Sequence, residues 1–294
     1  MITTTGIIST SFGRQYIVST ATKTYQTVSK GKSTEFVVGD KVEINILNDE
    51  QAQIIKLYPR HNLIYRSDQN RSKMIASNIE QLLIVIAAKP TFNINFLNSC
   101  LVAAEAEQIK PIIVLNKADL IESDEFITKI TDLYGSQLNY QIEIHSVNNP
   151  NHNLINLIKH KRSLFIGQSG VGKSTITNWL FPNANARIGD IAKYERSGKH
   201  TTTNATLYLL DETTQLIDCP GLQEFGLFHL NIDQVAEYFP DMLQNLGSCK
   251  FNNCIHLNEP QCKILELVNN AQIDSSRYAF YSHLCNRLKT KKSY

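Results

Sequence analysis

A glycine-rich segment that begins at Gly167 has the residue types of a phosphate-binding loop. Its sequence, GQSGVGKS, matches the pattern GxxxxGK[ST] and stands between an apolar run and a helical segment, as that pattern requires. Glycines let backbone N–H groups turn inward around phosphate oxygens, Lys173 can reach the β- and γ-phosphates, and the Ser174 hydroxyl can ligate Mg²⁺. The pattern alone does not separate ATP from GTP. The loop residues are Gly167, Gln168, Ser169, Gly170, Val171, Gly172, Lys173, Ser174 and Thr175.

A second segment, NKAD, indicates which base the nucleotide carries, because it matches the pattern NKxD and follows an apolar run. Asp119 can accept hydrogen bonds from N1–H and the N2 amine of guanine, whereas adenine has an unprotonated N1 and no such amine. Ser146 ends another apolar run and resembles the last guanine-contacting segment, although Val147 stands where alanine is usual. We therefore expect GTP and GDP to bind. The residues expected at the base are Asn116, Lys117, Ala118, Asp119 and Ser146.

A third segment could sense the γ-phosphate. Asp218 and Gly221 match the pattern DxxG, in which the aspartate holds the Mg²⁺ shell and the glycine amide meets the γ-phosphate. Three consecutive threonines precede this segment, and we expect Thr202 or Thr203 to offer a hydroxyl to the same Mg²⁺ as Ser174. The sequence leaves open which of these threonines is the ligand.

The order of the three segments is unusual. In ordinary small GTPases the phosphate loop comes first and NKxD fourth, whereas here Asn116 precedes Gly167. Chain order does not prevent assembly, because such loops meet at one end of neighbouring strands. The sequence therefore predicts a circularly permuted GTPase domain in which the DxxG segment leads directly into whatever follows it.

Cysteines and a histidine near the C-terminus have the spacing of metal ligands. Three thiolates and one imidazole lie within fourteen residues and would fill the four positions of a closed, tetrahedral site. We expect one structural zinc ion there. The four ligands are Cys249, Cys254, His256 and Cys262.

The elements that must position these residues divide the chain into three parts. Residues 1–68 contain about five short β-type runs separated by turn residues, which predicts an all-β, OB-like barrel. Residues 69–228 alternate strands and helices, which predicts an α/β domain with a mostly parallel sheet. Residues 229–294 show helical spacing around the cysteine cluster and are expected to form a mainly α-helical zinc domain. The strands expected in the middle part are residues 81–88, 111–115, 140–145, 162–166, 206–210 and 215–217.

Composition limits the other functions. The chain has 294 residues, with 29 Lys and Arg against 27 Asp and Glu, so bulk charge does not by itself argue for nucleic-acid binding. The chain lacks the long apolar run of a membrane-spanning helix and the basic, apolar start of an export signal. We expect a cytoplasmic protein without membrane contact, monomeric by default.

Taken together, the OB-like start, NKAD, GQSGVGKST, KHTTT, DCPG and the cysteine–histidine cluster resemble the bacterial ribosome small subunit-dependent GTPase A family over essentially the whole chain. The resemblance implies a GTPase that binds the small (30S) ribosomal subunit late in its assembly and is stimulated by it. It also implies that the OB-like and zinc domains contact ribosomal RNA.

One position departs from ordinary GTPases. Leu222 follows DxxG, where many GTPases carry the glutamine that orients the attacking water. Leucine cannot hydrogen-bond water, so we expect slow intrinsic hydrolysis that a partner accelerates. His200 is a candidate catalytic residue for orienting water, with a solvated loop histidine as the alternative. Leu222 also keeps open a second function, a GTP-binding RNA-binding or scaffold protein with negligible hydrolysis.

Overall fold

The N-terminal strands close into a barrel. The computed structural model describes residues 2–13, 15–29, 35–67, 72–182, 205–211, 213–219 and 226–290. In the barrel, β1 (Ile2–Phe12) pairs with both β2 (Gln15–Ser19) and β4 (Lys41–Ile46). β3 (Thr24–Ser29) pairs with β2 and runs parallel to β5 (Gln51–Leu57), which returns to β4. This closed order confirms the expected OB-like barrel.

β1 can join two neighbours because it changes register between Ile8 and Thr10, where an irregularity bends the strand. Its first half pairs with β4 and its second half with β2. The side chains that point inward, including Tyr16, Val18 and Ile44, are buried and fill the barrel. Successive side chains of a strand point to opposite faces, so every second residue of these strands faces the inside of the barrel.

A hairpin that the sequence analysis missed connects the barrel to the middle of the chain. It consists of β6 (Leu63–Ser67) and β7 (Ser72–Ser77), which pair antiparallel. The boundary expected after residue 68 lies between these two strands, outside the described residues. Polar residues interrupt the run, so the two short strands have little pattern of their own to reveal them.

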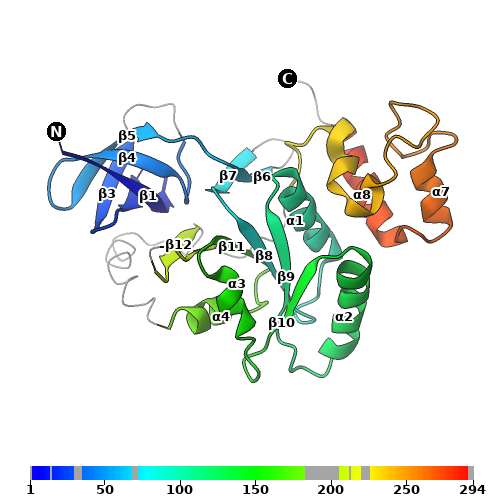
Figure 1. The fold of residues 1–294 in the computed structure, drawn as a ribbon, viewed down its shortest axis with the longest axis horizontal. Helices are drawn as coiled ribbons and strands as arrows, with labels where there is room; N and C mark the ends of the chain where they lie inside the picture. Colours follow the sequence, from blue (N-terminus) through cyan, green and yellow to red (C-terminus); the bar gives the residue numbers. More distant parts are fainter. Residues whose placement is uncertain are drawn as a thin grey trace.

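The central domain is built on a mostly parallel sheet in the order β10, β9, β8, β11, β13, β12 (Figure 1). Only β12, among these strands, pairs antiparallel with its neighbour. The strands are β8 (Gln81–Ile86), β9 (Lys110–Leu115), β10 (Gln141–Ile144), β11 (Arg162–Ile166), β12 (Thr206–Leu209) and β13 (Gln215–Asp218). The bounds of all six lie within two residues of the expected ranges.

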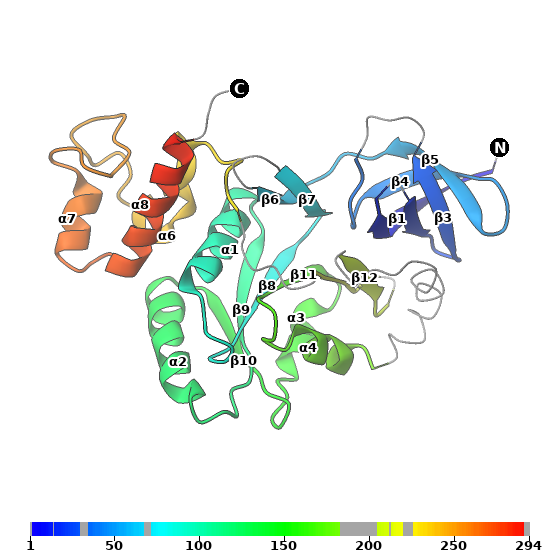
Figure 2. The same ribbon diagram turned by 180° about the vertical axis from the view of Figure 1, so that it is seen from behind.

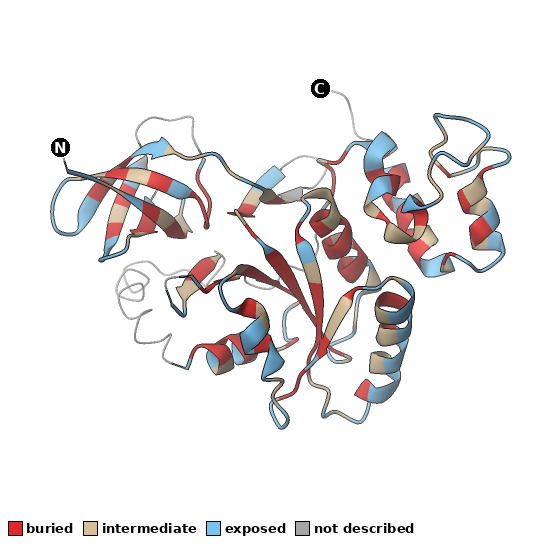
Figure 3. Ribbon diagram, in the orientation of Figure 1, coloured by how far each residue is buried: buried red, intermediate tan, exposed pale blue. Residues whose placement is uncertain are grey.

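Both faces of this sheet are covered, which explains the uninterrupted apolar sequence of β8 (Figure 3). Ile84 and its even-numbered neighbours pack into the core under α1, whereas Val85 packs into a second core under α3 and α4. The helices of this domain are α1 (Ile94–Ala106), α2 (Ser123–Ile130), the π-helical turn η1 (Thr131–Gln137), α3 (Asn153–Ile158) and α4 (Lys173–Leu180).

Among the described residues, the barrel contacts the central domain at β12 and at the start of β11. Thr10 of β1 pairs with Thr206 of β12, so the barrel continues the central sheet. Arg162, at the start of β11, donates from Nη1 to the carbonyl of Gly39 at 2.9 Å. Next to Gly39, the buried carboxylate of Asp40 accepts two hydrogen bonds from Arg60, both 2.7 Å. The β1–β12 pair and the Arg162–Gly39 hydrogen bond therefore join the barrel to the central sheet.

The C-terminal part packs on the opposite side of the central domain (Figure 2). It contains the 3₁₀-helix η2 (Ile232–Tyr238), α6 (Pro240–Leu243), α7 (Lys263–Asn269) and α8 (Ser275–Lys289), as expected for a mainly α-helical domain. Arg277 of α8 is fully buried and donates to Asp241 at 3.0 Å and to Asn98 of α1 at 2.9 Å. A single arginine therefore joins the C-terminal domain to α1. No helix within the described ranges has the length and apolarity needed to span a membrane.

Candidate functional site

The segments expected to bind nucleotide meet at the carboxyl ends of the strands of the central sheet. The glycine-rich loop follows β11, NKAD follows β9, Ser146 follows β10, and Asp218 is the last residue of β13. These four strands run parallel, so their carboxyl ends lie at the same edge (Figure 1). That edge is where open α/β sheets bind ligands.

The glycine-rich loop has the backbone shape that phosphate binding requires. Gly170 and Gly172 have φ values of +82° and +95°, a region that residues with a Cβ rarely adopt. Lys173 is buried and points into the loop, donating to the carbonyls of Gly167 at 2.6 Å and Gln168 at 3.1 Å. α4 begins at Lys173, so the positive end of its dipole faces the loop.

NKAD contacts this loop directly. Asn116 Nδ2 donates a buried hydrogen bond of 2.8 Å to the carbonyl of Val171, and Lys117 Nζ donates to the carbonyl of Gly170 at 2.6 Å. A Cβ added to Gly172 would lie 2.3 Å from Asn116 Nδ2. The sequence predicted a base-reading role for Asn116 and Lys117; the structure shows that their side chains also hold the phosphate loop in place.

The side chain at the base-reading position has a partner that the sequence analysis did not identify. Asp119 Oδ2 accepts a hydrogen bond of 2.7 Å from Asn148 Nδ2. Ser146 is buried, and its Oγ accepts from the backbone N–H of Asn149 at 3.0 Å. The loops after β9 and β10 are also joined by the N–H of Ala118, which donates to the carbonyl of His145 at 3.2 Å. Asn148 belongs to no sequence motif, so only the structure identifies it as a partner of Asp119.

Asp218 and Ser174 provide oxygen atoms suited to Mg²⁺. Asp218 Oδ1 is buried and has no hydrogen-bond partner among the described residues. Burial raises the pKa of this carboxyl group, and the nearby positive charge of Lys173 opposes that shift. Ser174 is exposed at the first turn of α4. A buried carboxylate oxygen and a hydroxyl fit a hard cation that prefers oxygen ligands.

The remaining expected residues of this site fall outside the part of the chain that the structure describes. These residues are Thr202, Thr203, Gly221 and the catalytic candidate His200, together with Leu222. Their predicted roles therefore stay predictions.

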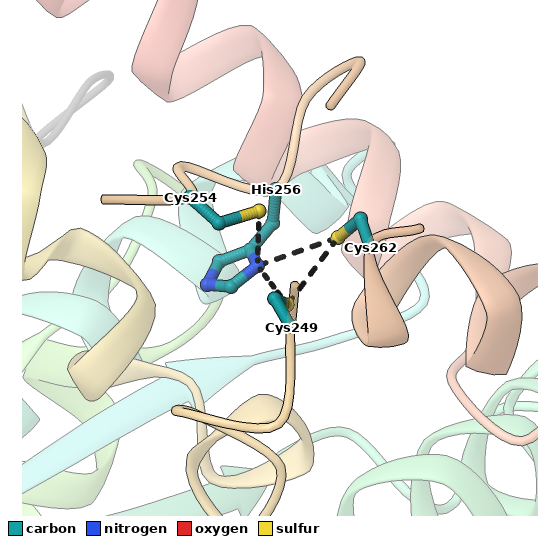
Figure 4. A group of neighbouring side chains, drawn as sticks. All are labelled: Cys249, Cys254, His256 and Cys262. Atoms are coloured by element: carbon teal, nitrogen blue, oxygen red, sulfur yellow. Dashed lines mark hydrogen bonds between the residues drawn. The ribbon is translucent and has the colours of Figure 1, made fainter. Parts of the chain in front are cut away.

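The expected metal ligands converge in the C-terminal domain (Figure 4). Nδ1 of His256 lies 3.4 Å from the Sγ atoms of Cys249, Cys254 and Cys262, and Cys249 and Cys262 have their sulfurs 3.8 Å apart. A tetrahedral zinc ion has bonds of about 2.3 Å to sulfur and about 2.1 Å to nitrogen. Such an ion places nitrogen and sulfur about 3.6 Å apart and two sulfurs about 3.8 Å apart. The four side chains therefore fit zinc in size and in chemistry.

The surrounding residues prepare this cluster for a metal. Burial lowers the pKa of the His256 imidazole, which favours the neutral form that a metal needs. Burial raises the pKa of Cys254 to about 12, so a cation is required to hold the thiolates. Tyr278 and Tyr281 of α8 donate to carbonyls of the ligand loop, at 3.0 Å to His256 and 2.7 Å to Ile255. α8 thus holds the backbone of the ligand loop through these hydrogen bonds.

A mostly parallel sheet with a GxxxxGK[ST] loop after β11 and an NKxD segment after β9 defines a class of protein, the P-loop GTP-binding proteins. The family model for the RsgA GTPase matches residues 57–228. Two relatives, from Nitrosospira multiformis and Neisseria gonorrhoeae, are named small ribosomal subunit biogenesis GTPase RsgA. They are 40% and 42% identical over 98% and 97% of this chain and 92% of their own lengths. The chain therefore belongs to the RsgA GTPase family and is a GTPase.

Solved structures support the permuted fold. YjeQ from Thermotoga maritima matches 99% of this chain and 100% of its own, with a TM-score of 0.76 and 24% identity. YloQ, described as a circularly permuted GTPase, matches 100% of this chain and 97% of its own, with a TM-score of 0.72 and 24% identity. The expected three-part fold with a permuted nucleotide domain is confirmed.

The contact between Gly172 and Asn116 can be tested by Gly172→Ala. The new Cβ displaces the Asn116 amide from Val171 and forces a residue with a side chain to φ +95°. We expect GTP and GDP affinity to fall at least about tenfold, in line with the loss of a buried hydrogen bond plus backbone strain. Titration with fluorescent GTP and GDP analogues measures both affinities.

Gly13→Ala is the matched control, because Gly13 has φ +68° and nothing within 4 Å of an added Cβ. It carries the backbone strain without the contact, so its GTP affinity should equal that of the unaltered protein. Equal losses in both variants would show that the approach of Asn116 does not matter.

The metal cluster is tested by Cys254→Ser. We expect zinc content, measured by elemental analysis, to fall from about one ion per chain to near zero, because a hydroxyl is a poor replacement for a thiolate. The melting temperature should fall as well, since structural zinc contributes to folding. Cys285→Ala is the control, because Cys285 is a buried thiol of α8 outside the cluster, and it should retain zinc. Retained zinc in Cys254→Ser would contradict the assignment.

Proposed function

We propose that this chain hydrolyses GTP late in the maturation of the small (30S) ribosomal subunit, and that the subunit stimulates this reaction. The observation that carries the proposal is the similarity of 40–42% identity over 97–98% of the chain to relatives named for small ribosomal subunit biogenesis. We further propose that the protein acts as a cytoplasmic monomer, with the subunit and its rRNA as partners.

The proposed roles of the site residues follow from their positions at the carboxyl ends of the strands. Asp119 reads guanine, and Lys173 with the backbone of its loop holds the phosphates. Ser174 and Asp218 hold Mg²⁺, which when bound neutralises charge on the phosphate oxygens. The three cysteines and His256 hold one structural zinc ion, which leaves no position for a substrate.

The need for a partner follows from the sequence after DxxG. Leu222 occupies the position at which many GTPases carry a water-orienting glutamine, and a leucine side chain offers no hydrogen bond. Hydrolysis is therefore slow until the subunit completes the site.

Rates of GTP hydrolysis with purified subunits test this proposal. We expect small subunits to raise turnover at least about tenfold and large subunits to leave it unchanged, since partner-supplied groups accelerate related GTPases by far more. Lys173→Ala should lose the stimulated reaction while still binding the subunit. An unchanged rate across a titration of small subunits would overturn the proposal and favour a GTP-binding scaffold.

The barrel presents a surface suited to RNA. Lys41 Nζ and Lys56 Nζ lie 5.3 and 5.0 Å from the ring centroid of Tyr58, and both lysines are exposed. The N–H of Tyr58 donates to the carbonyl of Lys41 at 3.0 Å, which holds β4 and the end of β5 together. In proteins that bind nucleic acids, aromatic rings stack on bases and lysine ammonium groups contact phosphates. We assign this barrel patch, Lys41, Lys56 and Tyr58, to rRNA contact.

Replacing both lysines of the barrel patch with alanine should weaken binding to small subunits and reduce the slope of log affinity against log salt by about 1 to 2, as expected for the loss of two phosphate contacts. The matched control is Lys129→Ala with Lys159→Ala, which removes the same charge from exposed positions of the central domain. Equal salt slopes for the two double variants would contradict the assignment.

A further inference from the structure

The loop between β10 and α3 is unusually well anchored for an exposed segment. Asn151 and Asn153 both donate to the carboxylate of Glu143, at 2.9 and 3.1 Å, and Glu143 is only 8% exposed. The N–H of Asn151 also donates to Nδ1 of His145 at 3.1 Å. One asparagine of the loop and the first residue of α3 are thus fixed to the strand that precedes the loop.

The same loop is braced against the helix that follows the phosphate loop. The buried ring of His145 lies 5.1 Å from the ring of Trp179 on α4, and the ring of His152 lies 5.6 Å from Trp179. Because His145 Nδ1 accepts a hydrogen bond, its ring is neutral with the proton on Nε2, in agreement with the pKa that burial lowers. His145 precedes the loop and His152 lies at its end, so the contacts with Trp179 hold both ends of the loop against α4.

Asn148 lies between these anchors, and its side chain is held near NKAD. Its amide donates to Asp119 Oδ2 at 2.7 Å, a short bond to a charged acceptor. A carboxylate has about four lone-pair sites, so this bond uses one and leaves the others for the base. It also favours one orientation of the carboxylate, whose terminal torsion is otherwise broad.

We propose that Asn148 is a positioning residue for guanine recognition, acting through Asp119. The proposal rests on the proposed base-reading role of Asp119. With its carboxylate held in one plane, Asp119 can accept from both N1–H and the N2 amine of guanine at once. Adenine presents an acceptor at N1, and the fixed carboxylate cannot turn toward a different donor. Asn148 therefore increases both affinity for guanine and discrimination between bases.

The experiment compares Asn148→Ala with the unaltered full-length protein by titration with GTP, ITP and ATP. ITP keeps N1–H and lacks the N2 amine. We expect GTP affinity to fall about tenfold, the size of a hydrogen bond to a charged group, and ITP affinity to fall less. ATP binding should not change. With small subunits present, KM for GTP should rise while kcat at saturating GTP stays the same.

Asn149→Ala is the matched control, because Asn149 is an exposed neighbour whose backbone N–H contacts Ser146 Oγ. It should bind GTP like the unaltered protein. A second comparison places Asn148→Ala in an Asp119→Ala background, where it should change GTP affinity by less than about twofold, because the group it positions is gone.

The outcomes separate this proposal from the function on which it rests. If Asp119→Ala weakens GTP binding and Asn148→Ala does not, the role of Asn148 is wrong and base reading by Asp119 stands. If Asp119→Ala has no effect, both are wrong. Equal losses for GTP, ITP and ATP in Asn148→Ala, or a full loss in the Asp119→Ala background, would mean that Asn148 only supports the loop, which also overturns the proposal.

Discussion

The buried hydrogen bond from Asn116 to the carbonyl of Val171 joins the two halves of the nucleotide site. One half is the predicted base-reading segment, and the other is the predicted phosphate loop. The bond needs a glycine at position 172, because any Cβ there would meet the Asn116 amide at 2.3 Å. Lys117 adds a second link by donating to Gly170. Two side chains of NKAD thus connect the two predicted halves of the site.

The permuted order places this site between two domains that connect to different parts of it. β12 pairs with β1 of the barrel through Thr206 and Thr10, and β13, which ends at Asp218, leads toward the C-terminal domain. Arg277 fixes that domain to α1, which packs on β8 beside the phosphate loop strand. Each outer domain therefore contacts an element of the central domain that carries or lies beside part of the predicted nucleotide site.

Much of the fold and site could be predicted because local patterns carry them. The apolar runs of β8 and β9 indicate buried strands, and the three nucleotide segments and the zinc ligands are recognised by spacing alone. The β6–β7 hairpin was missed because its strands are short and polar. Asn148 was missed because its contact with Asp119 joins two different loops, and the sequence holds no periodic or motif signal for such a contact.

The sequence by itself determined the permuted chain order and predicted the chemistry, namely which residues can bind phosphate, guanine and zinc. Those properties depend on residue type and on short spacings, which the local backbone preserves. Only the tertiary structure decided that Asn116 supports the phosphate loop, that Trp179 and Glu143 brace the base-reading loop, and that Arg277 joins α8 to α1. Such contacts depend on which strand ends the sheet order places side by side, and that order results from packing of the whole chain.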